Sequence, residues 1–335
     1  MGVDGSNQKK TVMVIGTGGT ISCLGSDPFD LHDYPVSGER LTTDEMLAMF
    51  KLSFDDIDVV PSGFKPVSST ELGPKFWFAL ISEIEQAIRQ IEHLAGIVVT
   101  HGTATLEESA FATDLLHNTD VPVVFTGAQR PENAISSDAP HNLWSAIQVA
   151  ADPKARDRGV LVVMNGLIFS AADVSKVDNF ALDAFQARSG PLGHINGRAV
   201  NFQSPPFRRP VQLRLEKHET WPRVEIIPSY AGADGTLIEA TITAGAQGFI
   251  VAGLAPGYAT PDQRLALRKA RQQGIVVVMA SRALNGTTLP LKQNDIPGLI
   301  GAGSLTPQKA RILLALGLSE LLDVDGIRQL FERFT

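Results

Sequence analysis

The stretch that most constrains the fold of this chain lies at residues 96–116, where a strand pattern changes into a helix pattern across a glycine turn. Residues 96–99 form an apolar run with the length of a buried strand. Thr105 is followed by Glu108, which is the spacing of a helix capping box. Thr103 is therefore predicted to lie at a strand's carboxyl end, beside a helix N-terminus whose free N–H groups stabilise negative charge. Taken alone, the same pattern is also typical of an ordinary strand–helix turn.

A second threonine-bearing turn precedes the first in the chain. Residues 12–15 predict a short strand, and the sequence Gly-Thr-Gly-Gly-Thr-Ile follows at 16–21. A dinucleotide-binding fingerprint would need glycine where Ile21 stands, and no Gly-Lys-Ser/Thr follows for a phosphate-binding loop. What remains is a glycine-rich turn that presents Thr17 and Thr20 at the end of a strand.

The rest of the chain alternates between strand and helix patterns, which predicts an α/β fold with parallel sheets in two domains. A proline-rich and charged segment interrupts the pattern, so we predict an N-terminal domain at 1–203, a linker at 204–221 and a C-terminal domain at 222–335. Residues 22–40 are interpreted as a long polar loop, and residues 173–176 as a shorter polar loop. Further strands are expected at 121–125, 159–164, 224–227, 248–252 and 275–279, and helices at 74–93, 141–151, 235–245, 261–273 and 307–319.

Composition narrows the function classes. The 335 residues carry a net charge of -7, which argues against a nucleic-acid or anionic-membrane partner and leaves a small-molecule substrate. The single cysteine, Cys23, excludes an intrachain disulfide and a cysteine-based zinc site. No apolar run has the length of a membrane span, and the first ten residues lack the apolar segment of a signal peptide. We therefore predict a cytoplasmic protein.

Several motifs in this order resemble the bacterial-type L-asparaginase family, which includes glutaminase-asparaginases. They are Thr-Gly-Gly-Thr-Ile at 17–21, Thr-His-Gly-Thr at 100–103, Thr-Gly-Ala-Gln-Arg-Pro at 126–131, Gly-Val-Leu-Val-Val-Met-Asn at 159–165, Asp-Val-Ser-Lys at 173–176 and Gly-Ser-Leu-Thr-Pro-Gln-Lys-Ala-Arg at 303–311. The resemblance covers nearly the full length. It implies a larger N-terminal and a smaller C-terminal α/β domain, a homodimer or homotetramer with shared sites, and amide hydrolysis by a threonine nucleophile without metal or cofactor.

The resemblance also assigns roles by position. Thr20 matches the nucleophile and Tyr34 its loop partner, while Thr103 and Lys176 match a second catalytic pair. A threonine hydroxyl needs a proton acceptor to become a nucleophile, and a desolvated lysine can act as a base. Backbone N–H groups of a turn such as that at Gly102 would stabilise the oxyanion. Ser69 matches the contact to the substrate carboxylate, and Ala128 a backbone contact near the substrate amide.

The chain departs from the family where the substrate's α-ammonium binds. The family motif is His-Gly-Thr-Asp-Thr, whereas this chain has Ala104 in place of the aspartate. Thr70 stands where an amide or acidic residue is usual, and Tyr258 and Lys292 fall where a partner subunit supplies asparagine and glutamate. A buried ammonium without acceptors costs several kcal/mol. We therefore predict a substrate without a free α-ammonium.

The sequence is compatible with three functions. The first is an acyl-enzyme hydrolase that acts on a non-amino-acid amide, an N-acylated amino acid, an imide, or a lactone or ester, by double displacement or by direct attack of water. The second is an ordinary L-asparaginase, either active as it stands or inactivated by an Ala104 that was introduced for crystallisation. The third is a non-catalytic binding protein on the same fold, against which the retained Thr20, Tyr34, Thr103 and Lys176 argue.

Overall fold

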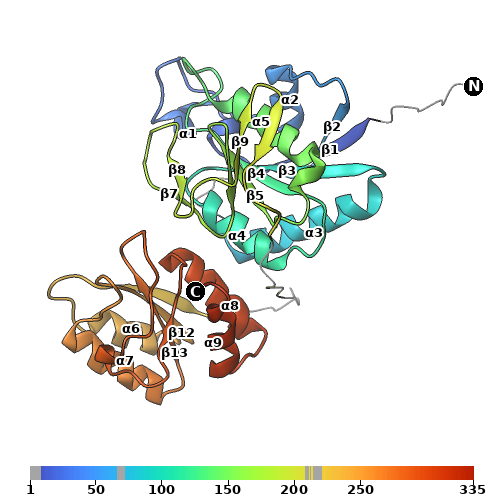
Figure 1. Cartoon of the computed structure of the whole chain (residues 1–335). Helices are drawn as coiled ribbons and strands as arrows, with labels where there is room; N and C mark the ends of the chain where they lie inside the picture. Colours follow the sequence, from blue (N-terminus) through green and yellow to red (C-terminus); the bar gives the residue numbers. More distant parts are fainter. Residues whose placement is uncertain (1–8, 66–71, 208–210, 212, 214–220) are drawn as a thin grey trace, which may run out of the picture. The chain divides into compact units, whose positions relative to one another are not determined.

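The computed structural model describes residues 9–65, 72–207, 211, 213 and 221–335. The chain divides into two compact units, which are residues 1–208 (unit 1) and 209–335 (unit 2). Each unit is a sheet covered by helices, as expected from the alternating pattern (Figure 1). The two-domain α/β fold is therefore confirmed. Within the predicted linker at 204–221, residues 208–210, 212 and 214–220 lie outside the described part.

The main sheet of unit 1 has the strand order β10-β9-β6-β5-β4-β3-β1-β2. In chain order its strands are β1 (Lys10–Gly16), β2 (Ile57–Pro61), β3 (Leu94–Thr100), β4 (Val123–Thr126), β5 (Leu161–Met164), β6 (Leu167–Ser170), β9 (Gly193–Asn196) and β10 (Ala199–Phe202). A separate antiparallel hairpin pairs β7 (Val174–Lys176) with β8 (Phe185–Ala187). The helical segments of unit 1 are η1 (Thr20–Ser22), α1 (Tyr34–Ser37), α2 (Thr43–Phe50), α3 (Pro74–Gln90), α4 (Leu106–Leu116), α5 (Ala139–Ala151) and η3 (Pro153–Ala155).

Alternate residues of the central strands pack on opposite faces of this sheet. Val12 and Val98 belong to a core with α2 and α5, whereas Ile15 and Val99 belong to a core with α3 and α4. Both faces are thereby buried, which explains why the strands read as continuous apolar runs. The polar turns that connect strands to helices lie at the carboxyl edge of the sheet, which is where an α/β sheet binds ligands.

The sheet of unit 1 is not parallel throughout, in contrast to the prediction. β2, β1, β3, β4 and β5 are parallel, but β6, β9 and β10 pair antiparallel. The reason is the two-residue turn at Asn165 and Gly166, whose φ angles of 50° and 72° suit the tight hairpin that Asn-Gly favours.

Two local predictions are wrong. Residues 173–176 were expected in a loop, but Val174–Lys176 is strand β7. Thr105 precedes α4 as expected but makes no side-chain capping hydrogen bond. Its ψ of 16° differs from the ψ angles of 168° at Thr42 and 161° at Thr260, whose capping boxes do form.

Unit 2 is built on a parallel sheet of order β11-β12-β13-β14. Helices α6 and α7 share a core with one face of this sheet, and α8 contacts β11, β12 and β13. The elements are β11 (Val224–Pro228), α6 (Thr236–Thr243), β12 (Gly248–Gly253), α7 (Pro261–Gln272), β13 (Val276–Ser281), η4 (Lys292–Asn294), β14 (Ile300–Gly301), α8 (Pro307–Ser319) and α9 (Val324–Glu332). No helix in the described ranges is long and apolar enough to cross a bilayer.

Candidate active site

The turn after β1 holds Thr20 at the start of η1. Gly18 and Gly19 have φ angles of 104° and 91°, which residues with a side chain rarely adopt. Thr17 anchors the turn to β3, because its backbone N–H and its hydroxyl both donate to the carbonyl of Thr100, at 3.0 Å and 2.8 Å. The side chain of Thr20 is buried within the turn.

The turn after β3 packs directly against the first one. A Cβ atom built on Gly19 would lie 2.2 Å from the Cα of Gly102, so the two backbones touch at a point where only glycine fits. The turn after β4 adds a third contact, since a Cβ on Gly127 would lie 2.6 Å from the carbonyl oxygen of His101. Three glycine turns from three parallel strands therefore meet at one edge of the sheet.

Thr103 and Lys176 form a hydrogen-bonded pair at this edge. The Lys176 Nζ donates to Thr103 Oγ1 at 2.8 Å and to Gln129 Oε1 at 3.3 Å. The backbone N–H of Lys176 donates to the carboxylate of Glu107, at the start of α4, at 3.0 Å. Burial lowers the pKa of Lys176, and the opposing attraction of Asp178 is the smaller effect. The amine therefore gives up its proton more readily than an ordinary lysine.

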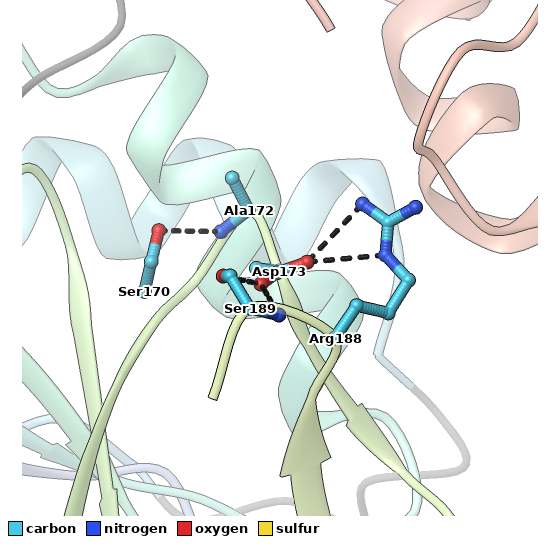
Figure 2. Close-up of polar contacts among 5 residues, drawn as sticks. All are labelled: Ser170, Ala172, Asp173, Arg188 and Ser189. Carbon is cyan, nitrogen blue, oxygen red and sulfur yellow. Dashed lines mark hydrogen bonds and ion pairs between the residues drawn. The ribbon is translucent and has the colours of Figure 1, made fainter. Parts of the chain in front are cut away.

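The hairpin that carries Lys176 is held by a polar cluster around Asp173 (Figure 2). The Arg188 Nε and Nη2 atoms each lie 3.2 Å from Asp173 Oδ1, and Ser189 donates its backbone N–H and its hydroxyl to Oδ2. Burial alone would raise the pKa of Asp173, but the bonds from Ser189 and the Arg188 charge outweigh it and hold the pKa below its usual value. The cluster joins the residue before β7 to residues after β8, and so fixes the base of the hairpin.

Thr20 has a partner from the long loop. Its Oγ1 lies 2.6 Å from the Tyr34 Oη, which belongs to α1. Burial raises the pKa of Tyr34, the hydrogen bond with Thr20 opposes this, and the nearby Cys23, Asp30 and Asp138 add to the rise. The phenol therefore stays protonated at neutral pH and can share its proton with Thr20.

A cavity of about 380 Å³ lies over these groups. This volume is in the range of small-molecule sites. Its lining in unit 1 comprises Gly19, Thr20, Cys23, Tyr34, Pro35, Arg40, Gly102, Thr103, Ala104 and Lys176. Thr20, Tyr34, Gly102, Thr103, Ala104 and Lys176 were predicted from the sequence as site residues, and the structure places all six around this one space.

The other predicted residues are not among the described lining residues of this cavity in unit 1. Ser69 and Thr70 fall outside the described residues. Ala128 is fully buried and does not line the cavity. Tyr258 and Lys292 belong to unit 2, where the Asn294 side chain bonds to the backbone on both sides of Tyr258, at Gly257 and Ala259, and Lys292 begins η4.

Some residues of the site were missed in the sequence. Gln129 stands in a quoted motif, and only the fold shows that it contacts Lys176. Cys23 and Arg40 line the cavity because their backbones pair across the base of the polar loop. No local pattern marks Arg40, since this pairing joins residues that are 17 positions apart. Within the described part of the chain, no cluster of three or more histidine, cysteine or carboxylate side chains could hold a metal ion.

Comparisons with known proteins agree with this geometry. Residues 11–208 match the family model "Asparaginase, N-terminal", and residues 223–331 match "Glutaminase/Asparaginase C-terminal domain". A protein described as probable periplasmic L-asparaginase from Haemophilus influenzae is 33% identical over 96% of this chain and 93% of its own length. A glutaminase-asparaginase from Pseudomonas aeruginosa is 31% identical over 96% and 89%.

A solved structure shares the fold of the whole chain. The crystal structure described as probable cytoplasmic L-asparaginase from Campylobacter jejuni superposes with a TM-score of 0.90 at 30% identity, and covers 97% of this chain and 100% of that one. Both domains of the family are thus matched in order and over nearly their full length. The chain belongs to the asparaginase family of amidohydrolases.

Proposed function

We propose that this protein hydrolyses a carboxamide through an acyl-threonine intermediate, with Thr20 as the nucleophile. The observation that carries this proposal is the arrangement of two hydrogen-bonded pairs, Thr20–Tyr34 and Thr103–Lys176, around one cavity. In the first step the Thr20 oxygen bonds to the amide carbon while Tyr34 accepts the hydroxyl proton and passes its own proton to the departing nitrogen. Ammonia leaves, and the phenol remains neutral throughout, which agrees with its raised pKa.

The second step releases the acid. Water bonds to the acyl carbon while its proton moves through the Thr103 hydroxyl to Lys176. The bond between the acyl carbon and the Thr20 oxygen then breaks as Tyr34 donates its proton to Thr20, and exchange with solvent returns a proton to Tyr34 and removes the one on Lys176. A lysine whose pKa is lowered by burial suits this role. Backbone N–H groups of the glycine turns would stabilise the tetrahedral oxyanion in both steps.

We propose further that the substrate has no free α-ammonium. Ala104 lines the cavity where the family motif has aspartate, and no carboxylate is among the described lining residues. An amide, imide, lactone or ester without an amino group fits such a surface better than a cation does. L-asparagine is the second candidate, because relatives at 31–34% identity are named L-asparaginase or glutaminase-asparaginase.

Substrate panels and intact mass test these proposals together. The parent protein should release product from at least one amide, imide or lactone, and should gain the mass of an acyl group during turnover. Thr20→Ala should abolish the adduct and lower the rate by at least roughly 10²–10⁴-fold. Thr243→Ala, which removes an exposed hydroxyl from α6, should change neither the acyl adduct nor the rate.

The competing functions give different results. Ammonia release from millimolar L-asparagine by the parent protein would support the ordinary L-asparaginase. No release, with none restored by Ala104→Asp, would support altered specificity. If no compound turned over and no adduct formed, the acyl-enzyme proposal would be wrong and a binding protein would be favoured.

The assembly and the location of the protein also remain proposals. The roles suggested for Tyr258 and Lys292 require a neighbouring subunit, so we propose a homodimer or homotetramer, which sedimentation velocity would test. A cytoplasmic location stays a prediction, because one relative is described as periplasmic and one structural neighbour as cytoplasmic. Cell fractionation decides between them.

A further inference from the structure

The charges that line the cavity are all positive in unit 1. Lys176 and Arg40 are the cationic side chains among the described lining residues, and no described lining residue carries a carboxylate. A cavity of this kind attracts anions and repels ammonium groups. The two cations differ in how far each is available to a ligand.

Carboxylates do lie near the cavity, but they already accept hydrogen bonds from the protein. Asp138 accepts from the backbone N–H groups of Gln129 and Arg130, at 3.0–3.1 Å. Glu107 accepts from the backbone of Lys176, and Asp178 accepts from two backbone N–H groups at 2.8 Å. Asp30 likewise accepts from backbone N–H groups of its own loop. None of these four carboxylates neutralises the cavity from within its lining.

Lys176 is also committed to protein partners. Its amine donates to Thr103 and Gln129, and its burial disfavours the charged form. Arg40 differs in both respects. Arg40 is an exposed residue of the cavity lining, and no ion pair or hydrogen bond links it to another described side chain. An arginine stays charged at every physiological pH.

The backbone of Arg40 is fixed relative to the proposed nucleophile. Arg40 and Cys23 pair across the base of the polar loop, and flanking backbone hydrogen bonds of 2.7 Å and 2.9 Å join Leu41 to Ser22 and Leu24 to Glu39. Ser22 ends the 3-10 turn that begins with Thr20. A guanidinium held on this frame can form two parallel hydrogen bonds with a carboxylate.

We infer that Arg40 binds a carboxylate of the substrate, and that the substrate is a monoamide of a dicarboxylic acid that lacks an amino group. This inference rests on the proposed amide hydrolysis and adds the substrate class and the residue that selects it. The carboxylate would be held at Arg40 while the carboxamide lies between the two threonine pairs. Arg40 acts here in binding and leaves the chemical steps to the other residues.

Kinetics with two matched amides test the inference. Succinamate carries a carboxylate, and butyramide has a methyl group in its place. Arg40→Gln should raise the KM for succinamate about tenfold or more, leave kcat within about twofold, and leave butyramide unaffected. Arg40→Lys should keep part of the preference, because lysine retains the charge but not the two-point geometry. Added salt should weaken succinamate binding by the parent more than by Arg40→Gln.

A control variant separates a local from a general charge effect. Arg198→Gln also removes one positive charge from unit 1, at an exposed residue that pairs with Asp55 and does not line the cavity. It should keep the succinamate preference of the parent. If Arg198→Gln lowered the preference as much as Arg40→Gln does, the inference would be overturned.

Calorimetric titration with succinate, the expected product, separates this inference from the proposed function. If amides turn over but Arg40→Gln changes neither the succinamate preference nor the succinate Kd, the inference is wrong while the amidohydrolase proposal stands. If no amide turns over but succinate binds the parent and binds Arg40→Gln at least about tenfold more weakly, the carboxylate site at Arg40 stands, while the proposed reaction and the monoamide substrate class are both wrong. If the parent neither binds succinate nor prefers succinamate, the inference is overturned.

Discussion

Gly19 and Gly102 approach so closely that a Cβ on Gly19 would lie 2.2 Å from the Cα of Gly102. Gly19→Ala should therefore separate the two threonine turns, and the positive φ of Gly19 adds strain. We expect a loss of stability on the order of 1–3 kcal/mol and a fall in kcat of at least about 100-fold, because misplacement by an ångström is enough for such an effect. Chemical denaturation and steady-state kinetics measure both.

The matched control for this substitution is Gly63→Ala. A Cβ at Gly63 meets nothing within 4 Å, and its backbone does not require glycine. This variant should fold and turn over like the parent. Full activity of Gly19→Ala would contradict the role assigned to the close approach.

Lys176 should set the ascending limb of the pH–activity profile, because it must lose its proton to act as a base. Because burial lowers its pKa, the rate should rise with pH around a midpoint below the ordinary lysine value of 10.5. Asp178 raises this pKa, so Asp178→Asn should move the midpoint to lower pH. The measurement is kcat/KM against pH for the parent and for Asp178→Asn. Asp55→Asn, which changes an exposed carboxylate far from Lys176 in the sequence, is the control. An upward shift in Asp178→Asn would refute the assignment.

Asp173 should hold the hairpin that carries Lys176. Asp173→Asn removes the charge partner of Arg188, and hydrogen bonds to charged groups contribute about 1.5–3 kcal/mol. Since the pKa of Asp173 is lowered in the folded state, its stabilisation is present above the unfolded-state pKa and is lost as pH falls through the folded value. The free energy of unfolding of the parent should therefore fall as the pH is lowered, and that of Asp173→Asn should fall by less over the same range. If Asp173→Asn has a smaller kcat than the parent at every pH, and its circular dichroism spectrum is unchanged, the substitution has displaced Lys176 without unfolding the protein.

His101 should make the protein sensitive to acid. Burial lowers its pKa from 6.5 to about 4, and the hydrogen bond with the Gly102 carbonyl only partly opposes this. The unfolded chain then binds more protons between these values, so stability should decline as pH falls from 6.5 to 4, by roughly 3 kcal/mol. His101→Asn should lower stability at neutral pH and remove this decline. Urea titrations at several pH values give the free energies, and an equal decline in both proteins would contradict the prediction.

The strand–turn–helix units could be predicted because their signals are local. An apolar run followed by glycine and threonine places Thr20 and Thr103 at strand ends, and parallel strands bring their carboxyl ends to one edge. The hairpin at Asn165 and Gly166 carried an equally local signal, which the interpretation of the strands as parallel overlooked.

Other parts of the site depend on contacts between distant residues, which no local sequence pattern predicts. Lys176 reaches Thr103 across 73 positions of sequence, and only the resemblance to a family suggested the pair. Arg40 has no motif at all, and its place follows from backbone pairing with Cys23. Such residues are found when the fold is known, because tertiary packing alone brings them together.

The backbone hydrogen bonds at the base of the polar loop have a practical consequence for enzyme engineering. They clamp residues 22–24 to 39–41, so the intervening segment is closed at its ends whatever its own length or sequence. Closing a somewhat longer segment on the same clamp costs little entropy. Residues 25–38 can therefore be exchanged as a cassette. The exchange would replace Tyr34 and its surroundings, and the backbone of Thr20 and Arg40 would keep its position.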